Sequence, residues 1–300
     1  MHLGCAVNVA DERGKKMSAI ILDGKACAKH REAMVLDRTE AFLVRHGARP
    51  RLGIMTDGHD HASAVYVRNK LKAAERCGIE AEVIRLPENC TREAFEAILN
   101  DEEPRFDALI LQLPLTNRSD EEVFISCLPE DKDVDCLHPN NIGMLHSSVC
   151  FMPPCTPKGI ITLLKEYEIP LFGKHVVIVG RSNLVGRPLA ELMLQENATV
   201  TVCHSKTENL ADITRTADIL VVAIGKAKYI TADMVKPGAV VVDVGINRDE
   251  NDKLCGDVDF EAVKDIAAWI TPVPGGVGPM TVVSLMENVL MAALDRRICG

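Results

Sequence analysis

The sequence lacks the features that mark several protein classes. It contains no stretch of about 18 apolar residues, so no segment is predicted to cross a membrane. Its 11 cysteines form no C-x-x-C pair, which leaves no spacing typical of a zinc site. Reduced thiols in a cytosol-like compartment are the natural interpretation. We therefore expect a cytoplasmic globular protein with neither a bound metal nor a membrane partner.

An excess of basic charge is also missing. The chain has 43 acidic and 34 basic residues, which gives a net charge of −9 and a pI near 5.5. A protein that binds DNA or RNA needs a basic surface to face the phosphates. The balance predicts no nucleic-acid partner, although a local basic pocket for a small anion remains compatible with it.

The first residues lack a targeting signal. Residues 1–16 have no apolar core of the kind found in signal peptides, and Asp11 and Glu12 argue against a mitochondrial transit peptide. We expect residues 1–17 to form a disordered extension. The 300 residues fit two domains at roughly 100–200 residues each.

The first half of the chain alternates strand and helix patterns. Strands are predicted at 51–56 (RLGIMT), 80–85 (EAEVIR) and 107–113 (DALILQL), and helices at 24–47, 62–77 and 91–100. The apolar run at 107–113 is typical of a buried parallel strand. Such alternation implies parallel strands joined by helical crossovers.

The second half repeats this rhythm. Four short β-branched strands are predicted at 175–179, 199–203, 219–223 and 240–244, and an amphipathic helix at 281–297. Three prolines in the region 144–157 suggest a hinge. The fold class is thus a two-domain α/β protein. A domain boundary is therefore predicted near 153–154.

A glycine-bounded turn follows the first strand of the second half. Its sequence, from Gly180 to Pro188, is GRSNLVGRP, with G-x-S-x-x-x-G in place of the dinucleotide fingerprint G-x-G-x-x-G. Glycines at such a turn let the backbone approach a pyrophosphate at a helix N-terminus. A tight turn that only packs a helix on a sheet would need similar glycines, so both interpretations stand on the motif alone.

The end of the next strand favours NADP over NAD. An NAD site normally places an acid there, but the sequence is CHSKT over 203–207. Ser205 can donate to a 2′-phosphate, and Lys206 or Arg181 can supply positive charge. The alternative is a loop whose polar side chains are simply solvated.

The predicted helix at 62–77 carries a tyrosine and a lysine, Tyr66 and Lys70, at i and i+4. This spacing puts both on one helix face, where a lysine in a semi-buried cleft can transfer protons. A core-facing Tyr66 beside an exposed Lys70 is the alternative. Short-chain dehydrogenases share the spacing, but in those proteins it follows the nucleotide-binding half, whereas here it precedes it.

Two further polar residues are candidate site residues. Gln112 lies near the carboxyl end of a buried strand, which is where ligands bind in open α/β sheets. Asp135 belongs to the charged loop DKDVD over 131–135. The alternatives are a capped strand end for Gln112 and a solvated loop for Asp135.

Taken in order, these motifs resemble the bifunctional methylenetetrahydrofolate dehydrogenase/cyclohydrolase family over about residues 18–297. The segments that carry the resemblance are Ala62-Ser63…Tyr66-Val67…Lys70, Gln112-Leu113-Pro114-Leu115, Lys132-Asp133-Val134-Asp135, Pro154-Cys155-Thr156-Pro157, Gly180-Arg181-Ser182…Val185-Gly186…Pro188, Cys203-His204-Ser205 and the run TPVPGGVGPMT over 271–281. Each motif is moderately specific, and their joint occurrence in this order makes the resemblance strong.

The resemblance implies a two-domain α/β enzyme with a cleft between its domains. The folate-binding catalytic domain would span 18–153 and be completed by the C-terminal helix within 281–300, and a Rossmann-like NADP-binding domain would span 154–280. It implies NADP-dependent oxidation of 5,10-methylene-tetrahydrofolate to 5,10-methenyl-tetrahydrofolate, followed by hydrolysis to 10-formyl-tetrahydrofolate. The implied partners are a small folate substrate and a second copy of the chain in a homodimer. No metal is implied.

The resemblance also implies roles for particular residues. Lys70 would be the general acid/base of hydrolysis, with Gln112 hydrogen-bonded to it and tuning it. Tyr66 would stack on the folate, and Asp135 would pair with the amino edge of the pterin. The nucleotide would be held by Gly180, Arg181, Ser182, Gly186 and Ser205, and the shared pocket would be lined by Pro272, Gly276 and Val277.

Three positions depart from the family pattern. His61 replaces the proline of Val-Gly-Asp-Asp-Pro, Thr116 replaces a proline, and Cys136 replaces the glycine after Asp135. If that glycine needs a positive φ, Cys136 would strain the turn. The departures at His61 and Cys136 keep open the alternative of a folate-binding homologue without activity. A second alternative is another two-domain NADP dehydrogenase, similar to shikimate dehydrogenase, although the run PGGVGPMT over 274–281 argues against it.

Overall fold

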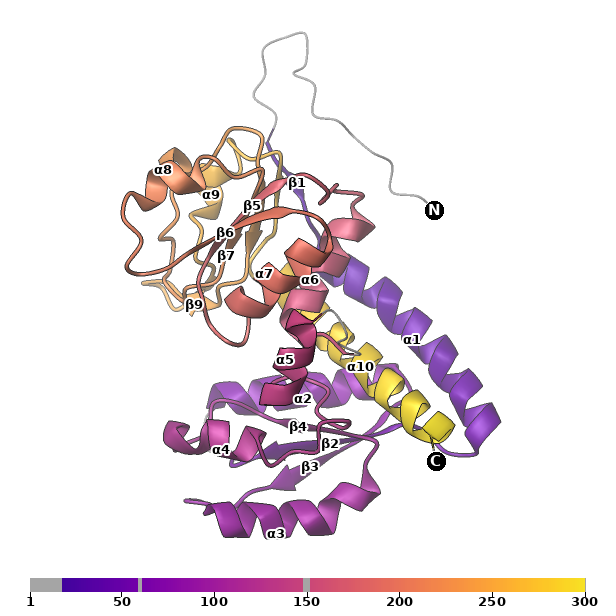
Figure 1. The fold of residues 1–300 in the computed structure, drawn as a ribbon. Coiled ribbons are helices and arrows are strands. Elements are labelled where there is room, and N and C mark those ends of the chain that lie inside the picture. Colours follow the sequence, from indigo (N-terminus) through magenta and orange to yellow (C-terminus); the bar gives the residue numbers. More distant parts are fainter. Residues whose placement is uncertain (1–17, 59–60, 148–151, 300) are drawn as a thin grey trace. The chain divides into compact units, whose positions relative to one another are not determined.

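The computed structural model describes residues 18–58, 61–147 and 152–299. Two compact units divide the chain, one formed by residues up to Ala28 with 156–281, the other by residues 29–155 with 282–300 (Figure 1). We call them the nucleotide unit and the catalytic unit. The predicted extension over 1–17 lies outside the described residues, as does part of the predicted hinge.

The catalytic unit is built on a parallel sheet of order β3-β2-β4. Its strands are β2 (Arg51–Thr56), β3 (Glu80–Arg85) and β4 (Ala108–Leu111), and its main helices are α1 (Gly24–His46), α2 (His61–Arg76), α3 (Arg92–Glu102), α4 (Glu121–Ile125) and α5 (Pro139–His146). The predicted strands and helices of this half are confirmed to within a few residues. Parallel pairing follows because helices link consecutive strands.

Successive residues of these strands serve opposite faces of the sheet. Ile54 and Ile110 pack with apolar residues of α1, α2 and α10 (Val277–Cys299). Met55 and Leu109 pack on the other face with Phe95 of α3 and residues of α4. Figure 1 shows α2 and α3 on opposite sides of this sheet.

Helix α10 differs from the amphipathic helix predicted at 281–297. It begins earlier, at Val277, and its residues 283–290 are all buried. The helix packs against both α1 and the sheet within the catalytic unit, so even its polar Asn288 is enclosed. An exposed polar face is therefore absent from the described middle of this helix.

The nucleotide unit contains a six-stranded sheet of order β1-β11-β8-β7-β5-β6, parallel throughout. Its strands are β1 (Ile20–Ile21), β5 (His175–Val179), β6 (Thr199–Cys203), β7 (Ile219–Val222), β8 (Val240–Asp243) and β11 (Trp269–Ile270). The four predicted strands are confirmed. The chain moves from β5 to β6 on one side and then crosses to β7 on the other, so its direction across the sheet reverses at β5.

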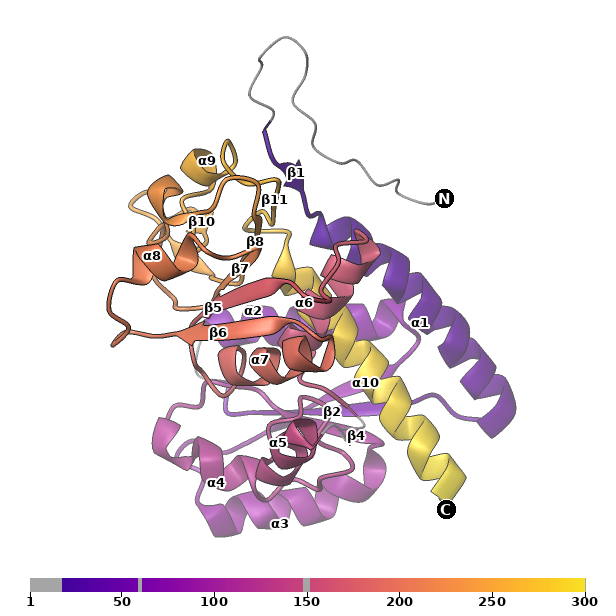
Figure 2. The same cartoon turned by 45° about the horizontal axis from the view of Figure 1, so that its top comes forward.

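Helices cover both faces of this sheet, as expected for a parallel sheet. These are α6 (Cys155–Glu166), α7 (Gly186–Gln195), α8 (Leu210–Thr214) and α9 (Phe260–Val263). Val177, Val179 and Leu220 pack with residues of α8 and α9. Figure 2 shows α7 beside β5 and β6.

The amino-terminal boundary differs from the predicted domains. Residues 18–28 were expected in the catalytic domain, but Ile20 and Ile21 of β1 pair with Trp269 and Ile270 of β11. The backbone N–H of Leu22 also donates to the carbonyl of Ile270 at 2.9 Å. The unpaired edge of β11 therefore recruits this short strand into the nucleotide unit, a long-range pairing that no local pattern signals.

Candidate functional site

Lys70 and Gln112 are in direct contact in the catalytic unit. The Nζ of Lys70 donates to the Oε1 of Gln112 at 3.0 Å. Lys70 lies on α2, and Gln112 follows β4 directly, at the carboxyl edge of the parallel sheet. The contact implied by the resemblance is present, so a potential acid–base group is held where open α/β sheets bind ligands.

The amide of Gln112 is held in one orientation. Its side chain is buried, and its Nε2 donates to the carbonyl of Leu113 at 2.6 Å. Its backbone N–H donates to Met55 on the neighbouring strand at 2.8 Å. With the amide nitrogen committed, the oxygen is left to accept from Lys70.

Tyr66 and Lys70 do not adopt the alternative arrangement of a core-facing tyrosine and an exposed lysine. The Tyr66 residue is 39% exposed, whereas Lys70 is partly buried. Partial burial raises the pKa of the Tyr66 phenol above its ordinary value, so it stays neutral at physiological pH. An exposed aromatic ring one helical turn from the lysine is available for stacking on a flat ligand.

The segment that carries Asp135 runs beside β4. The backbone N–H of Leu109 donates to the carbonyl of Lys132 at 2.7 Å, and Asp133 forms a parallel bridge with Leu109. The bridge is a single residue long, and the chain turns directly after it, where the backbone N–H of Cys136 donates to the carbonyl of Asp133 at 3.3 Å. Asp135 lies within this turn.

Buried polar contacts fix this segment on both sides of Asp135. The Asp133 carboxylate accepts from the backbone N–H of His138 at 2.7 Å and from Nδ2 of Asn141 at 3.0 Å. Burial raises the pKa of Asp133. The ammonium of Lys132 is 1% exposed and donates to the carbonyl of Glu103 at 2.7 Å. Asp135 itself stays partly exposed.

Cys136 occupies the strained conformation that the sequence comparison anticipated. Its φ is +56° and its side chain is 1% exposed. Left-handed backbone disfavours any residue with a Cβ by about 1–2 kcal/mol. The turn after Asp135 therefore keeps the geometry that a glycine would adopt more easily.

The turn after β5 in the nucleotide unit depends on two glycines. A Cβ on Gly180 would lie 2.2 Å from the carbonyl oxygen of Ala223, and one on Gly186 would lie 2.1 Å from that of Gly180. Helix α7 begins at Gly186. No side chain fits at either position, which is the condition for backbone to approach a pyrophosphate at this helix.

The polar residues of this turn face outward. Arg181 and Ser182 are exposed, and the Oγ of Ser182 accepts from the backbone N–H of Val185 at 3.2 Å. Beyond β6, Ser205 and Lys206 are exposed on a turn in which the N–H of Lys206 donates to Nδ1 of His204 at 3.1 Å. Donors and positive charge without a carboxylate suit a 2′-phosphate.

The glycine-rich run before α10 is a tightly packed turn of the nucleotide unit. A Cβ on Gly276 would lie 2.7 Å from the carbonyl oxygen of Pro272. The carbonyl of Gly275 accepts from the backbone N–H of Lys25 at 2.9 Å, and Val277 is buried. The turn is thus anchored, while Pro272 stays partly exposed.

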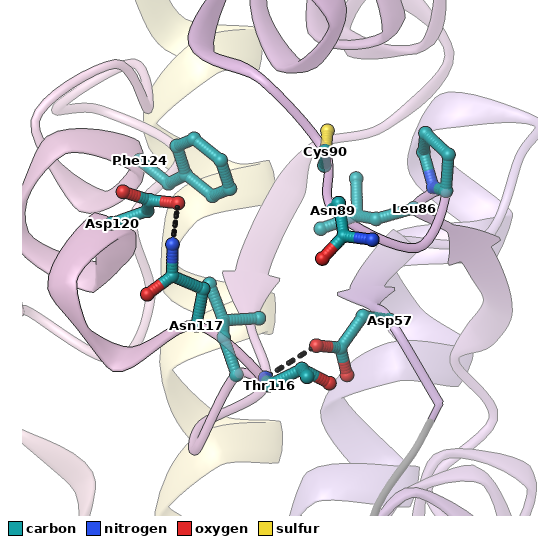
Figure 3. A pocket seen from close by; sticks show the side chains of 10 residues that line it. Asp57, Leu86, Asn89, Cys90, Thr116, Asn117, Asp120 and Phe124 are labelled. Atoms are coloured by element: carbon teal, nitrogen blue, oxygen red, sulfur yellow. Dashed lines mark hydrogen bonds between the residues drawn. The ribbon is translucent and has the colours of Figure 1, made fainter.

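A separate small hollow lies in the catalytic unit, with a volume of about 300 Å³ that includes space open to solvent. It opens where β2, β3 and β4 end, and it is lined by Asp57, Leu86, Pro87, Asn89, Cys90, Leu115, Thr116, Asn117, Asp120 and Phe124. Figure 3 shows Asp57 accepting from the backbone N–H of Thr116, a bond of 2.6 Å. None of the candidate site residues lines this hollow.

The described parts of the chain contain no group of three or more His, Cys, Asp or Glu side chains placed to hold a metal ion. One helical stretch, Val277–Asp295, is long and apolar enough to cross a membrane by composition, but 67% of it is buried inside the protein, as in a core helix. No disulfide involves Cys27, Cys77, Cys90, Cys127, Cys136, Cys155, Cys203 or Cys255.

Fold and site together define a two-domain α/β enzyme with a separate dinucleotide-binding unit. The family model of the tetrahydrofolate dehydrogenase/cyclohydrolase catalytic domain matches residues 22–135, and that of the NAD(P)-binding domain matches residues 154–297. The chain belongs to the tetrahydrofolate dehydrogenase/cyclohydrolase family. The predicted fold class and the bifunctional dehydrogenase/cyclohydrolase activity are confirmed.

Individual relatives support this family assignment. The bifunctional protein FolD of Streptococcus pneumoniae serotype 4 is 50% identical over 276 residues, 91% of this chain and 97% of that protein. The crystal structure of the bifunctional enzyme FolD from Campylobacter jejuni, 43% identical, matches with a TM-score of 0.89 over 93% of this chain and all of that one. The Trypanosoma brucei enzyme complexed with NADP and an inhibitor, 37% identical, has the same TM-score over 95% of this chain and 100% of that one.

The similarity to solved structures also bears on the alternative of a dehydrogenase similar to shikimate dehydrogenase. A shikimate dehydrogenase from Thermus thermophilus shares 15% identity at a TM-score of 0.53, a similarity of fold alone. The alternative of a dehydrogenase of that kind is therefore not favoured. The predicted cofactor, NADP, is confirmed at the level of the family by the NAD(P)-binding domain and the relative bound to NADP.

Sequence reasoning missed several buried polar residues near these sites, Asn288, Asp243 and Asp257 among them. Asn288 donates to the carbonyls of Val134 at 2.9 Å and Pro153 at 3.0 Å, which ties the Asp135 segment to α10. A signal was available for Asp243, because it ends an apolar strand just as Gln112 follows one. Asn288 lies in an apolar helix, and its partners could not be read from the sequence.

Proposed function

We propose that Lys70 is the acid–base group with which this enzyme hydrolyses 5,10-methenyl-tetrahydrofolate. The observation that carries the proposal is the hydrogen bond of 3.0 Å between Lys70 and the buried amide of Gln112. Water adds to the methenyl carbon, loses a proton, and the bond from that carbon to N5 breaks to leave the formyl group on N10. Lys70 accepts and returns the proton, and Gln112 holds its ammonium in place.

The preceding oxidation needs no proton acceptor from the protein. Loss of a hydride from the methylene carbon leaves a cation shared by two nitrogens, so this step needs positioning more than a proton acceptor. NADP, when bound, supplies the hydride acceptor. We assign Tyr66 to stacking on the folate and Asp135 to the amino edge of the pterin, as the resemblance implies. Tyr66 is exposed and Asp135 is partly exposed, so both can reach a ligand.

Binding of NADP is assigned to the nucleotide unit. Gly180 and Gly186 allow the pyrophosphate to approach the backbone, and Arg181, Ser182 and Ser205 offer donors and charge to the phosphates. The turn that contains Pro272, Gly276 and Val277 is assigned to the wall of the pocket beside the nicotinamide and the folate.

A homodimer is part of the proposal. Strand β6 is the outermost strand at one edge of its sheet, and Val202 on it and Leu194 on α7 are 37% and 52% exposed. An open edge with apolar side chains is suited to pairing with a second copy. The net charge of −9 and the eight cysteines outside disulfides fit a cytoplasmic enzyme without nucleic-acid or membrane partners. Sedimentation of the purified protein tests the dimer.

One coupled assay tests the reaction itself. The protein is given 5,10-methylene-tetrahydrofolate and NADP, and the formation of NADPH and then of 10-formyl-tetrahydrofolate is followed. We expect both products in sequence. A folate-binding homologue without activity would yield neither, and a dehydrogenase for another substrate would yield no NADPH with this folate.

A further inference from the structure

Two buried carboxylates lie at the carboxyl edge of the sheet in the nucleotide unit. Asp243 is the last residue of β8, and Asp257 follows β10 (Leu254–Cys255), which forms a hairpin with β9 (Asn247–Arg248). Asp243 is 3% exposed and Asp257 is 0% exposed. The roles assigned above use neither residue. A buried carboxylate is stable only where hydrogen-bond donors surround it. The donors therefore show which part of the chain each carboxylate holds in place.

The donors to Asp257 come from a single loop and from one side chain. Its Oδ2 accepts from the backbone N–H groups of Ile224 at 2.6 Å and Gly225 at 3.0 Å. Its Oδ1 accepts from the N–H of Lys226 and from Nδ2 of Asn247, each at 2.8 Å. Successive backbone N–H groups of this kind form a concave anion-binding site. Here the protein's own carboxylate fills it and fixes the loop 224–226.

Asp243 in turn holds the backbone of Asp257. Its Oδ1 accepts from the N–H groups of Gly245 and Asp257, and its Oδ2 from that of Val258, all at 2.9 Å. A Cβ on Gly256 would lie 1.8 Å from the Asp243 carboxylate, so this approach is open only to glycine. The hydrogen bonds of the two carboxylates therefore connect β8 to the loop 224–226 through the backbone of Asp257.

That loop lies at the point where the sheet reverses direction. It follows β7, and the turn 180–186 follows the neighbouring strand β5. The two segments touch, because Gly180 has no room for a Cβ beside the carbonyl of Ala223. In open parallel sheets a dinucleotide binds outside the strand ends at such a switch point. The loop is thus placed as one wall of the nucleotide site.

We infer that Asp257, held by Asp243, is a positioning residue for NADP that fixes the loop 224–226 before the nucleotide arrives. The inference rests on the proposed NADP site. A loop already ordered by a buried carboxylate loses little conformational freedom on binding, which favours affinity. Asp257 itself has no exposed surface and acts only through the backbone that it holds.

The test compares Asp257→Asn with a matched control. The asparagine replaces one accepting oxygen with an NH₂ group that faces two donors, so the loop loses its anchor. Isothermal titration calorimetry of the parent and the variants measures the Kd for NADP, and initial rates measure its KM. We expect the Kd and the KM for NADP to rise about tenfold. Asp249→Asn, in the β9–β10 turn where the carboxylate accepts from Asn251 and Lys253, should leave both constants unchanged.

The second activity provides the internal reference. Hydrolysis of methenyl-tetrahydrofolate needs no nucleotide, so its rate without NADP should stay within about twofold in Asp257→Asn. A folded variant with parental NADP affinity overturns the inference and leaves the proposed function intact. Equal losses in both activities also overturn it, because Asp257 would then support the whole fold. A parent protein that binds no NADP overturns the proposed function and this inference together.

If the Asp257→Asn variant does not fold, a measurement on the parent protein tests the inference. Amide hydrogen exchange of Ile224, Gly225 and Lys226 is followed in the absence of NADP. We expect these three amides to exchange far more slowly than exposed loop amides, since each donates to a buried carboxylate. Exchange at the rate of an unprotected loop would overturn the inference.

Discussion

The ammonium of Lys70 lies 3.0 Å from the Oε1 of Gln112, and this bond joins α2 to the end of β4. Gln112 can offer that oxygen because its amide nitrogen is committed to Leu113. The lysine is therefore aimed by a neutral partner that leaves its charge uncompensated. A neutral partner suits a group that must both release and accept a proton.

Replacing Gln112 with Glu tests the importance of that neutral partner. A carboxylate at this distance favours the charged ammonium of Lys70, so we expect cyclohydrolase activity at neutral pH to fall about tenfold or more. The pH profile of hydrolysis should move to higher pH. Gln195→Glu, at the exposed end of α7, serves as the control. A parental pH profile for Gln112→Glu would show that Gln112 does not tune Lys70.

The positive φ of Cys136 predicts an inverted order of stability. Alanine normally stabilises a protein relative to glycine by about 0.4–1 kcal/mol, but at φ +56° the Cβ of alanine is disfavoured. Both Cys136→Gly and Cys136→Ala lose the buried thiol and differ only in that Cβ. We expect the glycine variant to be the more stable by about 1 kcal/mol in urea unfolding. The ordinary order would mean that the turn relaxes.

Asp243 predicts a pH dependence of stability. Burial raises the pKa of this carboxyl from 3.8 to about 6 in the folded protein. Between these values the folded state binds a proton that the unfolded state has released. Protonation of Asp243 therefore stabilises the folded protein fully below pH 3.8. As the pH rises from there through about 6, the free energy of unfolding falls by about 3 kcal/mol.

The measurement is urea unfolding of the parent and of Asp243→Asn across this pH range. The free energy of unfolding of the parent should fall relative to that of the variant as the pH rises from 4 to 7. A constant difference between the two proteins would show that the Asp243 pKa is the same in the folded and unfolded states.

Much of the fold could be predicted because local patterns specify it. The strands at 51–56, 80–85, 175–179 and 199–203 have the predicted bounds, since apolar β-branched runs between turn residues leave little choice. The pairing of β1 with β11 could not be predicted, because it joins residues about 250 positions apart in the chain and is two residues long. The buried character of α10 was missed because its few polar residues resemble a solvent face until their partners are known.

Arg181 predicts a nucleotide-specific effect. It is exposed on the turn after β5, where its guanidinium can contact a phosphate. Arg181→Ala should raise the KM for NADP about tenfold and leave that for NAD nearly unchanged, since only NADP carries the 2′-phosphate. Arg248→Ala, which removes a surface arginine bonded to Asp252, is the control. Equal effects on both nucleotides would place Arg181 away from the 2′-phosphate, and initial rates with NAD at or above those with NADP would overturn the cofactor assignment.

The candidate site was only partly readable from the sequence. The positions of Tyr66 and Lys70 on one helix follow from spacing, and the place of Gln112 follows from its strand. The contacts that orient Gln112 and hold the segment of Asp135 do not follow from the sequence. They involve the backbone groups of Leu113, His138 and Val134, whose positions depend on the whole unit. The hydrogen-bonded connection from Asp243 to Asp257 could not be predicted for the same reason.

The central claim is that Lys70 carries the proton transfers of hydrolysis, and Lys70→Met tests it most directly. The variant keeps a side chain of similar length but removes the ammonium. Lys72→Met, an exposed lysine on the same helix, is the matched control. We predict that Lys70→Met loses cyclohydrolase activity by about a hundredfold or more and still forms NADPH from methylene-tetrahydrofolate, while Lys72→Met keeps both activities. Hydrolysis of methenyl-tetrahydrofolate by Lys70→Met at the parental rate would contradict the account.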